Sequence, residues 1–136
     1  MFTRSIICFV ALFSFETSAA AQSFSQDRLH DWEFRFYACK NVLMNAVIVT
    51  RLMEKHQITD QRGIDGMQAD IGPAIANAVI ATEKNFQFVE GEALFLSDLT
   101  FAVVSSMVYA GFETSASQLI QSGNDICINT LESMAQ

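Results

Sequence analysis

The cysteines are the residues of this chain whose type and spacing most directly predict chemistry. Cys39 and Cys127 lie far apart, and neither a C-x-x-C nor a C-x-x-C-H motif occurs. Because redox-active dithiols and covalent haem sites need that close spacing, neither is expected. In an oxidising compartment, an even pair of cysteines has one possible connectivity. The sequence therefore predicts a structural Cys39–Cys127 disulfide, with two separate buried thiols as the alternative.

The N-terminal residues predict the compartment. Arg4, the apolar run 5–15 and the small residues Ala19-Ala20-Ala21 form the pattern of a secretory signal peptide. The apolar run, which contains Cys8, is too short to span a bilayer. We therefore expect residues 1–21 to be cleaved and the protein to reside in the periplasm of a bacterium. The exported chain then keeps two of its three cysteines.

Acidic residues outnumber basic ones, and the imbalance is concentrated in the second half of the chain. There are 15 Asp and Glu against 8 Lys and Arg, which gives a formal net charge of −7. After Arg62 the only Lys or Arg is Lys84. An acidic surface repels nucleic acid and anionic membranes and attracts basic proteins. We therefore expect a basic protein as the partner, and no nucleic acid.

The sequence offers few groups for catalysis or for metal binding. His30 and His56 are predicted near opposite ends of one helix, about 39 Å apart at 1.5 Å per residue, so they cannot share a metal ion within one chain. No G-x-S-x-G, H-E-x-x-H or phosphate-binding glycine motif occurs. We therefore expect no enzyme activity, no bound metal and no cofactor.

Residues 93–112, ALFLSDLTFAVVSSMVYAGF, are long and apolar enough to cross a bilayer. Polar residues nevertheless recur at helical spacing on one side of this stretch, while larger apolar residues fill the other. This predicted polar stripe consists of Asp98, Ser105 and Tyr109. No Lys or Arg follows the stretch to provide the positive flank of a membrane segment. We therefore expect a core helix over about 92–109 and no stable membrane insertion.

The environment of Asp98 decides whether the polar stripe has a function. A carboxylate removed from water must be paired, hydrogen-bonded or protonated. As part of a polar site, Asp98 would act together with Ser105 and Tyr109. On an ordinary solvated face it would lie at the solvent edge or pair with Arg35 or Lys40 of the first helix, and this second interpretation is the one that we favour.

Three further acids form a candidate partner surface: Glu90, Glu92 and Glu113. Glu90 and Glu92 flank a glycine and are expected on a solvated connector ahead of the apolar helix. Nothing near them in the sequence would separate their pKa values for acid–base catalysis. We therefore expect these carboxylates to face water or a basic partner.

Helical spacing accounts for the rest of the chain, and strand signals are weak. A long first helix is predicted over 26–56. Pro73 favours a second helix that starts near that residue and runs to about Lys84, with a longer helix that kinks at Pro73 as the alternative. A last helix is predicted from the capping box Ser115-x-x-Gln118, with Ile120, Gly123, Cys127, Thr130 and Met134 inward. The predicted inward seam of the first helix is Leu29, Trp32, Phe36, Cys39, Leu43, Ala46, Thr50 and Met53.

These elements predict an all-α fold, a compact four-helix bundle that forms a single domain over residues 22–136. Its first helix is long. Because both cysteines lie on inward seams, one disulfide is expected to join the first and last helices. The oligomeric state is not predicted.

A small exported bundle with one disulfide and an acidic second half fits a non-catalytic protein that binds another protein. In layout the chain resembles the small helical, disulfide-bearing periplasmic immunity proteins that neutralise cell-wall hydrolases of secretion systems. That resemblance implies inhibition by occlusion and assigns no residues. Two other functions stay open. One is a carrier or sensor of a small apolar ligand, with Trp32, Phe36, Phe95 and Phe101 around a cavity. The other is an accessory subunit of an envelope or secretion assembly.

Overall fold

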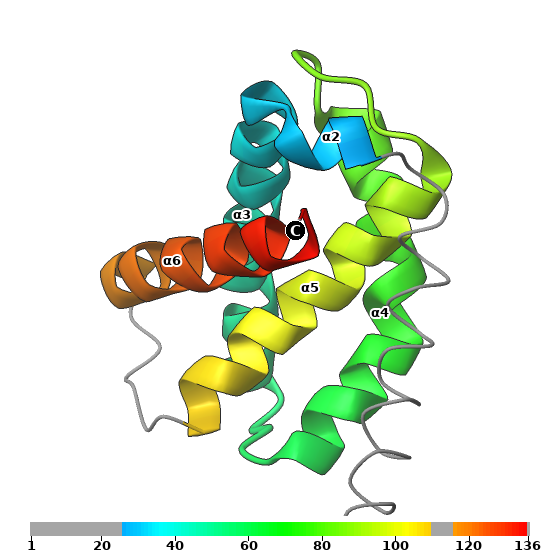
Figure 1. Ribbon diagram of the computed structural model, residues 1–136. Coiled ribbons are helices and arrows are strands. Elements are labelled where there is room, and N and C mark those ends of the chain that lie inside the picture. The colour runs from blue at the N-terminus through cyan, green and yellow to red at the C-terminus, as the bar shows by residue number, and fades with distance from the viewer. Residues whose placement is uncertain (1–25, 110–115, 136) are drawn as a thin grey trace, which may run out of the picture.

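The computed structural model describes residues 26–109 and 116–135, and every regular element in these two ranges is a helix. The predicted all-α four-helix bundle is confirmed, with four long helices around one core and a short helix ahead of them (Figure 1). The predicted signal peptide and Glu113 lie outside the described residues. The helices are α2 (Gln26–His30), α3 (Trp32–Lys55), α4 (Gln61–Thr82), α5 (Glu90–Tyr109) and α6 (Ala116–Met134).

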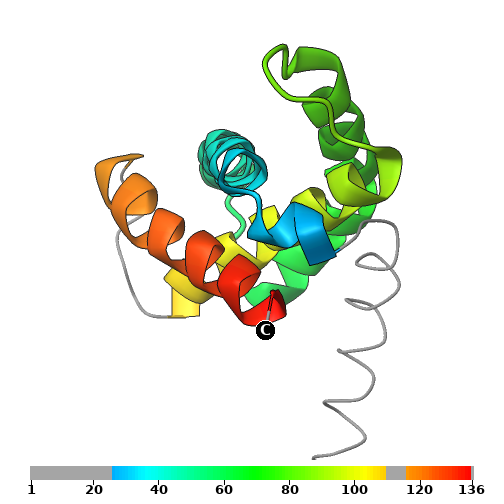
Figure 2. The same ribbon diagram turned by 45° about the horizontal axis from the view of Figure 1, so that its top comes forward.

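The central helix is α5, which packs against α3, α4 and α6. It runs beside α4 in Figure 1, while α6 lies across α3 and α5. Along the described residues the backbones of α4 and α6 are not adjacent, and in Figure 2 α6 runs in from the left while α4 rises to the right. This arrangement leaves the outer face of α5 open between two helices.

The central helix α5 contains most of the apolar stretch 93–112, which is long enough to cross a bilayer. Within the described part of the chain, Glu90–Val108 is the one segment long and apolar enough to cross a bilayer, and 61% of its most apolar window is buried inside the protein. Leu96, Val103 and Met107 are fully buried on its inward side. The predicted core helix is therefore present, and it starts two residues earlier than expected.

The predicted first helix is interrupted. It breaks at Asp31, whose carboxylate accepts a hydrogen bond from the N–H of Glu33 at 3.0 Å and caps α3. Beyond the break Phe34 is fully buried, whereas Trp32 and Phe36 are 67% and 57% exposed. The predicted inward seam is therefore wrong at these two aromatic positions.

The connection between α4 and α5 explains why Phe34, and not Trp32 or Phe36, faces the core. Phe86 and Phe88 of that connection contact the ring of Phe34, with centroids 6.0 and 5.8 Å away. Edge-to-face contacts of this kind favour burial of Phe34 over its neighbours. Farther along α3, Cys39 and Met53 are buried as predicted.

Helix α4 runs through Pro73, and the favoured prediction of a helix that starts there is wrong. The helix begins after Asp60, whose carboxylate accepts a hydrogen bond from the N–H of Gly63 at 2.8 Å. Proline removes the hydrogen bond to the carbonyl four residues earlier, which belongs to Ala69. Because Pro73 and Ala69 are both exposed, water can solvate that carbonyl.

The opposite side of α4 packs closely on α5. Gly72 is buried there, and its carbonyl accepts a hydrogen bond from the buried hydroxyl of Ser97 at 2.8 Å. A Cβ at Gly72 would lie 3.6 Å from that hydroxyl oxygen, an ordinary contact distance. A small residue at this position thus lets the two helices approach.

The predicted disulfide between Cys39 and Cys127 is present and joins α3 to α6, with a Cα–Cα distance of 5.8 Å. Both cysteines are buried. One turn earlier on α6, a Cβ at Gly123 would lie 2.9 Å from Cδ2 of Leu43, so the two helices are in close contact there. The predicted inward position of Ile120 is wrong, since its side chain is exposed.

Candidate functional site

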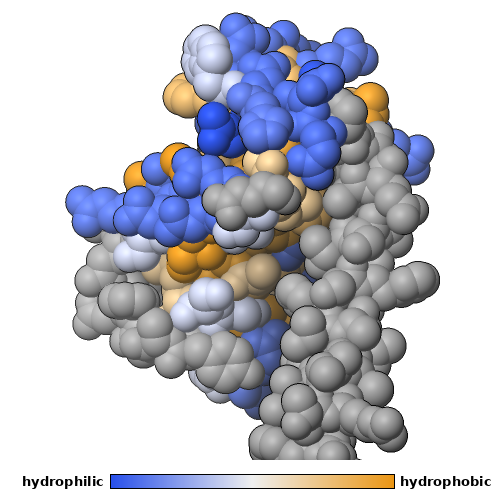
Figure 3. Space-filling view, viewed as in Figure 1, coloured by the Kyte–Doolittle hydropathy of each residue, from blue (hydrophilic) through white to orange (hydrophobic). Residues whose placement is uncertain are grey.

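The outer face of α5 carries a hollow of about 810 Å³, which we call the α5 groove. Its walls are α4 on one side and α6 on the other, and Figure 3 shows hydrophobic surface beneath α6 in this region. The residues that line it are Gln61, Asp65 and Gln68 of α4; Phe95, Asp98, Leu99, Phe101, Ala102, Ser105 and Ser106 of α5; and Ile126, Thr130, Ser133 and Met134 of α6.

One stripe of each helix faces the α5 groove, and the three stripes have the same spacing. Residues at i, i+4 and i+7 share a helix face, which explains why each set lies together. The predicted polar stripe supplies the set on α5. The other two were missed, although their spacing was visible in the sequence. The three sets are Gln61, Asp65 and Gln68; Asp98, Ala102 and Ser105; and Ile126, Thr130 and Ser133.

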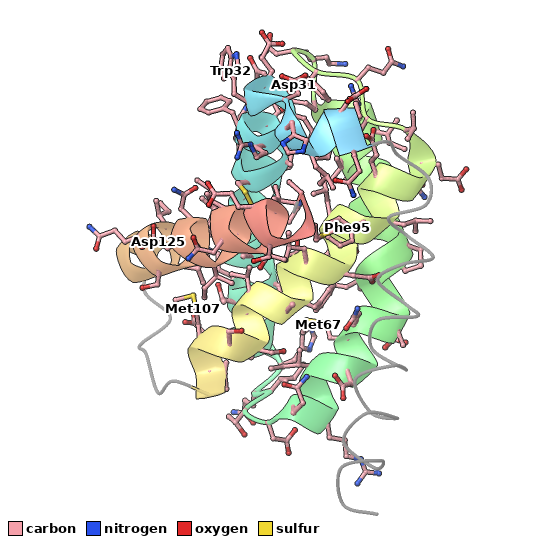
Figure 4. All side chains as sticks on the ribbon, viewed as in Figure 1. Asp31, Trp32, Met67, Phe95, Met107 and Asp125 are labelled. Carbon is pink, nitrogen blue, oxygen red and sulfur yellow. A yellow bond between two sulfur atoms is a disulfide. The ribbon has the colours of Figure 1, made fainter. Side chains whose placement is uncertain are left out.

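The floor of the α5 groove is apolar. Phe95, Leu99 and Phe101 are buried in the bundle and also border the hollow. Figure 4 shows Phe95 on α5 beside the C-terminal end of α6, where Met134 completes the lining. A ligand in this groove would therefore contact aromatic and aliphatic carbon.

The rim of the α5 groove is polar and acidic on its α4 side. Nε2 of Gln68 donates a hydrogen bond to Oδ1 of Asp98 at 3.1 Å. Nε2 of Gln61 donates to Oδ1 of Asp65 at 2.7 Å. Among the described lining residues there is no Lys, Arg or His. The groove therefore combines an apolar floor with two carboxylates and no basic side chain.

These contacts settle part of the prediction for the polar stripe. Asp98 lies at the solvent edge, the first of the two environments that the favoured interpretation named, rather than beside Arg35 or Lys40. Those two cations instead lie 3.6 and 3.4 Å from the carboxylates of Glu132 and Glu83. The structure brings Asp98 and Ser105 into one groove. The side chain of Tyr109 lies outside the described residues.

The predicted partner surface is not formed as expected, because Glu92 is buried. Its carboxylate is 1% exposed and accepts hydrogen bonds from Nε and Nη2 of Arg28, each at 2.9 Å. It also accepts a hydrogen bond from the N–H of Val89, the residue before α5, at 2.9 Å. Glu90 is exposed, and Glu113 lies outside the described residues. Glu92 thus fixes α2 against the start of α5 and does not face a partner.

Aromatic rings complete the surroundings of Arg28. Its guanidinium carbon lies 4.5 Å from the ring centroid of Phe86 and 5.3 Å from that of Phe34. Hydrogen bonding to Glu92 raises the pKa of Arg28 and outweighs the opposing effect of burial. A bidentate ion pair beside two aromatic rings is a structural tie, since the Glu92 carboxylate is buried and both of its oxygens accept hydrogen bonds.

A second buried acid joins the end of α4 to α3. The carboxylate of Glu83 accepts hydrogen bonds from Nδ2 of Asn41 at 2.9 Å and from the N–H of Asn85 at 3.1 Å. Nζ of Lys40 lies 3.4 Å away. Burial alone would raise the pKa of Glu83, but these donors outweigh it and hold the pKa below its ordinary value.

The predicted aromatic cavity is not formed as a unit. Phe95 and Phe101 line the α5 groove, whereas Trp32 and Phe36 lie exposed on α3. An apolar ligand in the α5 groove would therefore meet two of the four predicted rings.

A smaller hollow of about 430 Å³ lies where the α3–α4 connection meets α4, and His56 and Asp70 are among its lining residues. In the two described ranges, no three His, Cys, Asp or Glu side chains are grouped so that they could hold a metal ion. This hollow therefore carries no arrangement that points to a particular reaction.

Comparison with protein-family models, curated proteins and solved structures gives no match to this chain.

Proposed function

We propose that this chain is an exported, non-catalytic protein of the bacterial periplasm that binds a basic segment of another protein in the α5 groove. Binding there would inhibit the partner by covering that segment. The observation that supports this proposal is the pairing of an apolar floor with Asp65 and Asp98 on a rim that includes no basic lining residue among those described. Exposed apolar surface with a polar border is typical of protein interaction sites.

Each part of the groove has a distinct role in this proposal. Apolar side chains of the partner would cover the half-buried side chains of Ile126 and Met134 and release water from them, which is the main favourable contribution to association. Lys or Arg side chains of the partner would lie near Asp65 and Asp98 and would raise the association rate. The disulfide is compatible with an oxidising compartment, and the predicted signal peptide supports export.

A small apolar ligand is the second candidate occupant. The observation that favours it is the groove's volume of about 810 Å³, within the range of about 300–1,000 Å³ that small-molecule sites occupy. Native mass spectrometry of the exported protein distinguishes the two. A ligand that stays bound through purification, and is released by organic solvent, would support the carrier function.

The direct test of protein binding is an Ala102→Arg variant. Ala102 is exposed on α5 within the groove, so a long cationic side chain would fill the hollow and oppose a basic partner without entering the core. Ala74→Arg is the matched control, because Ala74 is an exposed helical alanine that lines neither hollow.

Periplasmic pull-down from the native bacterium is the measurement. We expect wild type and Ala74→Arg to capture the same basic protein, and Ala102→Arg to lose it. Capture should weaken with added salt, because the carboxylates on the rim are exposed. Retention of the partner by Ala102→Arg would place binding on another surface and refute the proposal.

A further inference from the structure

A row of large apolar side chains lies uncovered along the outer face of α3. Trp32, Phe36, Met44 and Ile48 are between 52% and 67% exposed, and Lys40 lies between them in the row. We call these five residues the α3 ridge. Figure 4 shows Trp32 at its outer end, pointing away from α5 and α6. Single exposed apolar residues are ordinary, but a continuous row on one helix marks an interaction surface.

The spacing of the α3 ridge is that of helix–helix packing. Its members follow one another every four residues, and such i±4 rows are the ridges that fit between the rows of a neighbouring helix. Trp and Phe are also among the side chains that contribute most to protein interfaces. The natural counterpart of this surface is therefore another helix.

The charges beside the α3 ridge indicate which helix would pack against it. Glu33 is exposed near the N-terminal end of α3, and Arg51 is exposed near its C-terminal end. Lys55 adds a second cation at the C-terminal end, and Glu54 an acid. A second α3 that runs antiparallel would bring Glu33 of each copy to Arg51 of the other, which makes the face complementary to itself.

We propose that the α3 ridge is the interface of a symmetric homodimer in which two α3 helices pack antiparallel. One register pairs four of the five ridge residues, and Trp32 lies outside these pairs. Phe36 lies opposite Ile48 of the second copy, Lys40 lies opposite Met44, and Glu33 lies opposite Arg51. Each pair occurs twice, as two-fold symmetry requires.

Lys40 fits this register although it lies in an apolar row. Its ammonium group is 3.4 Å from the carboxylate of Glu83 in its own copy, so the charge stays paired. Its methylene chain then covers the Met44 side chain of the second copy, as long cationic side chains commonly do at apolar surfaces.

The dimer leaves the proposed binding site open. Inward residues of α5, such as Leu96 and Met107, are buried in the bundle on the side away from the α5 groove. Helix α3 packs on that inward side. The two grooves of a dimer would therefore face away from each other, and one dimer would bind two partner molecules. The dimer itself does not depend on what the grooves bind.

Sedimentation equilibrium of the oxidised, exported chain is the test. We expect a dimer for wild type and for the control Ala74→Arg, and a monomer for Phe36→Asp. Glu33→Arg and Arg51→Glu should each weaken dimerisation by about tenfold, since each change places like charges together twice. The double variant Glu33→Arg/Arg51→Glu should restore the wild-type dimer.

The restoration separates this interface from every alternative. Only a contact between Glu33 and Arg51 of different copies is recovered when both charges are exchanged. Circular dichroism checks that each variant keeps its helices, as exposed positions should. A wild-type monomer, a dimer unaffected by Phe36→Asp, or a double variant as weak as the single ones would each overturn the proposal.

Discussion

The two walls of the α5 groove are attached to the molecule by different means. Helix α6 is joined to α3 by the Cys39–Cys127 disulfide and lies against it at Gly123. Helix α4 has no covalent tie in the described structure and packs chiefly on α5. Its further attachments are polar, at Ser97 and at Glu83. The groove therefore has one crosslinked wall and one wall held only by packing and hydrogen bonds.

This difference matters for binding because the groove exists only while both walls keep their places. Separation of α4 from α5 would open the groove on its acidic side, where Asp98 accepts a hydrogen bond from Gln68. An element that is not crosslinked to the rest of a protein can open locally while the remainder stays folded. A partner seated in the groove would contact both walls, so binding should stabilise α4 more than α6.

The largest expected effect comes from removal of the crosslink in a Cys39→Ala/Cys127→Ala variant. The bridge closes a loop whose ends are 88 positions apart in the sequence. On the chain-entropy model, a loop of that size contributes up to about 4–5 kcal/mol to the free energy of unfolding. Urea denaturation of the variant and of wild type checks this value.

Amide hydrogen exchange makes the same variant a test of the comparison between the walls. Without the bridge, protection in α6 should fall to the level of α4 or below. Reduced wild type serves as the control, because it lacks the bridge without a substitution. An unfolding free energy within about 1 kcal/mol of wild type would show that packing, not the bridge, holds α6.

An intermediate effect is expected from Glu92→Gln, because the change leaves Arg28 without its charged partner. Removal of one member of a buried ion pair costs about 3–5 kcal/mol, and the partial exposure of Arg28 reduces this to about 2 kcal/mol. Glu90→Gln is the matched control at an exposed position two residues earlier and should change stability by less than about 0.5 kcal/mol. Thermal unfolding of both variants is the measurement. Equal stabilities would contradict the structural role of Glu92.

The residues that were predicted from the sequence are those whose environment follows from local periodicity. Helical spacing placed Cys39 and Cys127 inward on two separate helices, and it placed Asp98 and Ser105 together on α5. Each of these inferences needed only the residues of one helix, and the fold class followed from the same patterns.

The errors arose where distant contacts outweigh the local pattern. Glu92 was predicted to be solvated because its partner, Arg28, lies 64 positions away in the sequence. The outward turn of Trp32 and Phe36 depends on Phe86 and Phe88 in a connection that has no periodicity. Likewise, the groove itself could not be predicted, because it requires knowing that α4 and α6 lie on either side of α5.

The smallest expected effect is a loss of stability at low pH, and we expect it in α4, the wall of the groove that is not crosslinked. The folded protein holds the pKa of Glu83 below its ordinary value of 4.5, so folding favours the ionised carboxylate. Its contribution to stability is complete above about pH 4.5 and is lost as the pH falls further through the lowered pKa. We expect protection of the end of α4 to fall in this range, while the disulfide keeps α6 attached to α3.

The variant Glu83→Gln isolates this contribution from that of the other acids. At pH 7 it should be less stable than wild type by about 1 kcal/mol, because a charged hydrogen-bond acceptor is replaced by a neutral one. Between pH 5 and pH 3 the variant should lose less stability than wild type, since its side chain has no proton to gain. Urea denaturation across this range measures both losses. If the free energies of unfolding of wild type and variant decrease equally between pH 5 and pH 3, Glu83 does not hold α4. The packing of α4 on α5 is then sufficient to keep that wall of the groove in place.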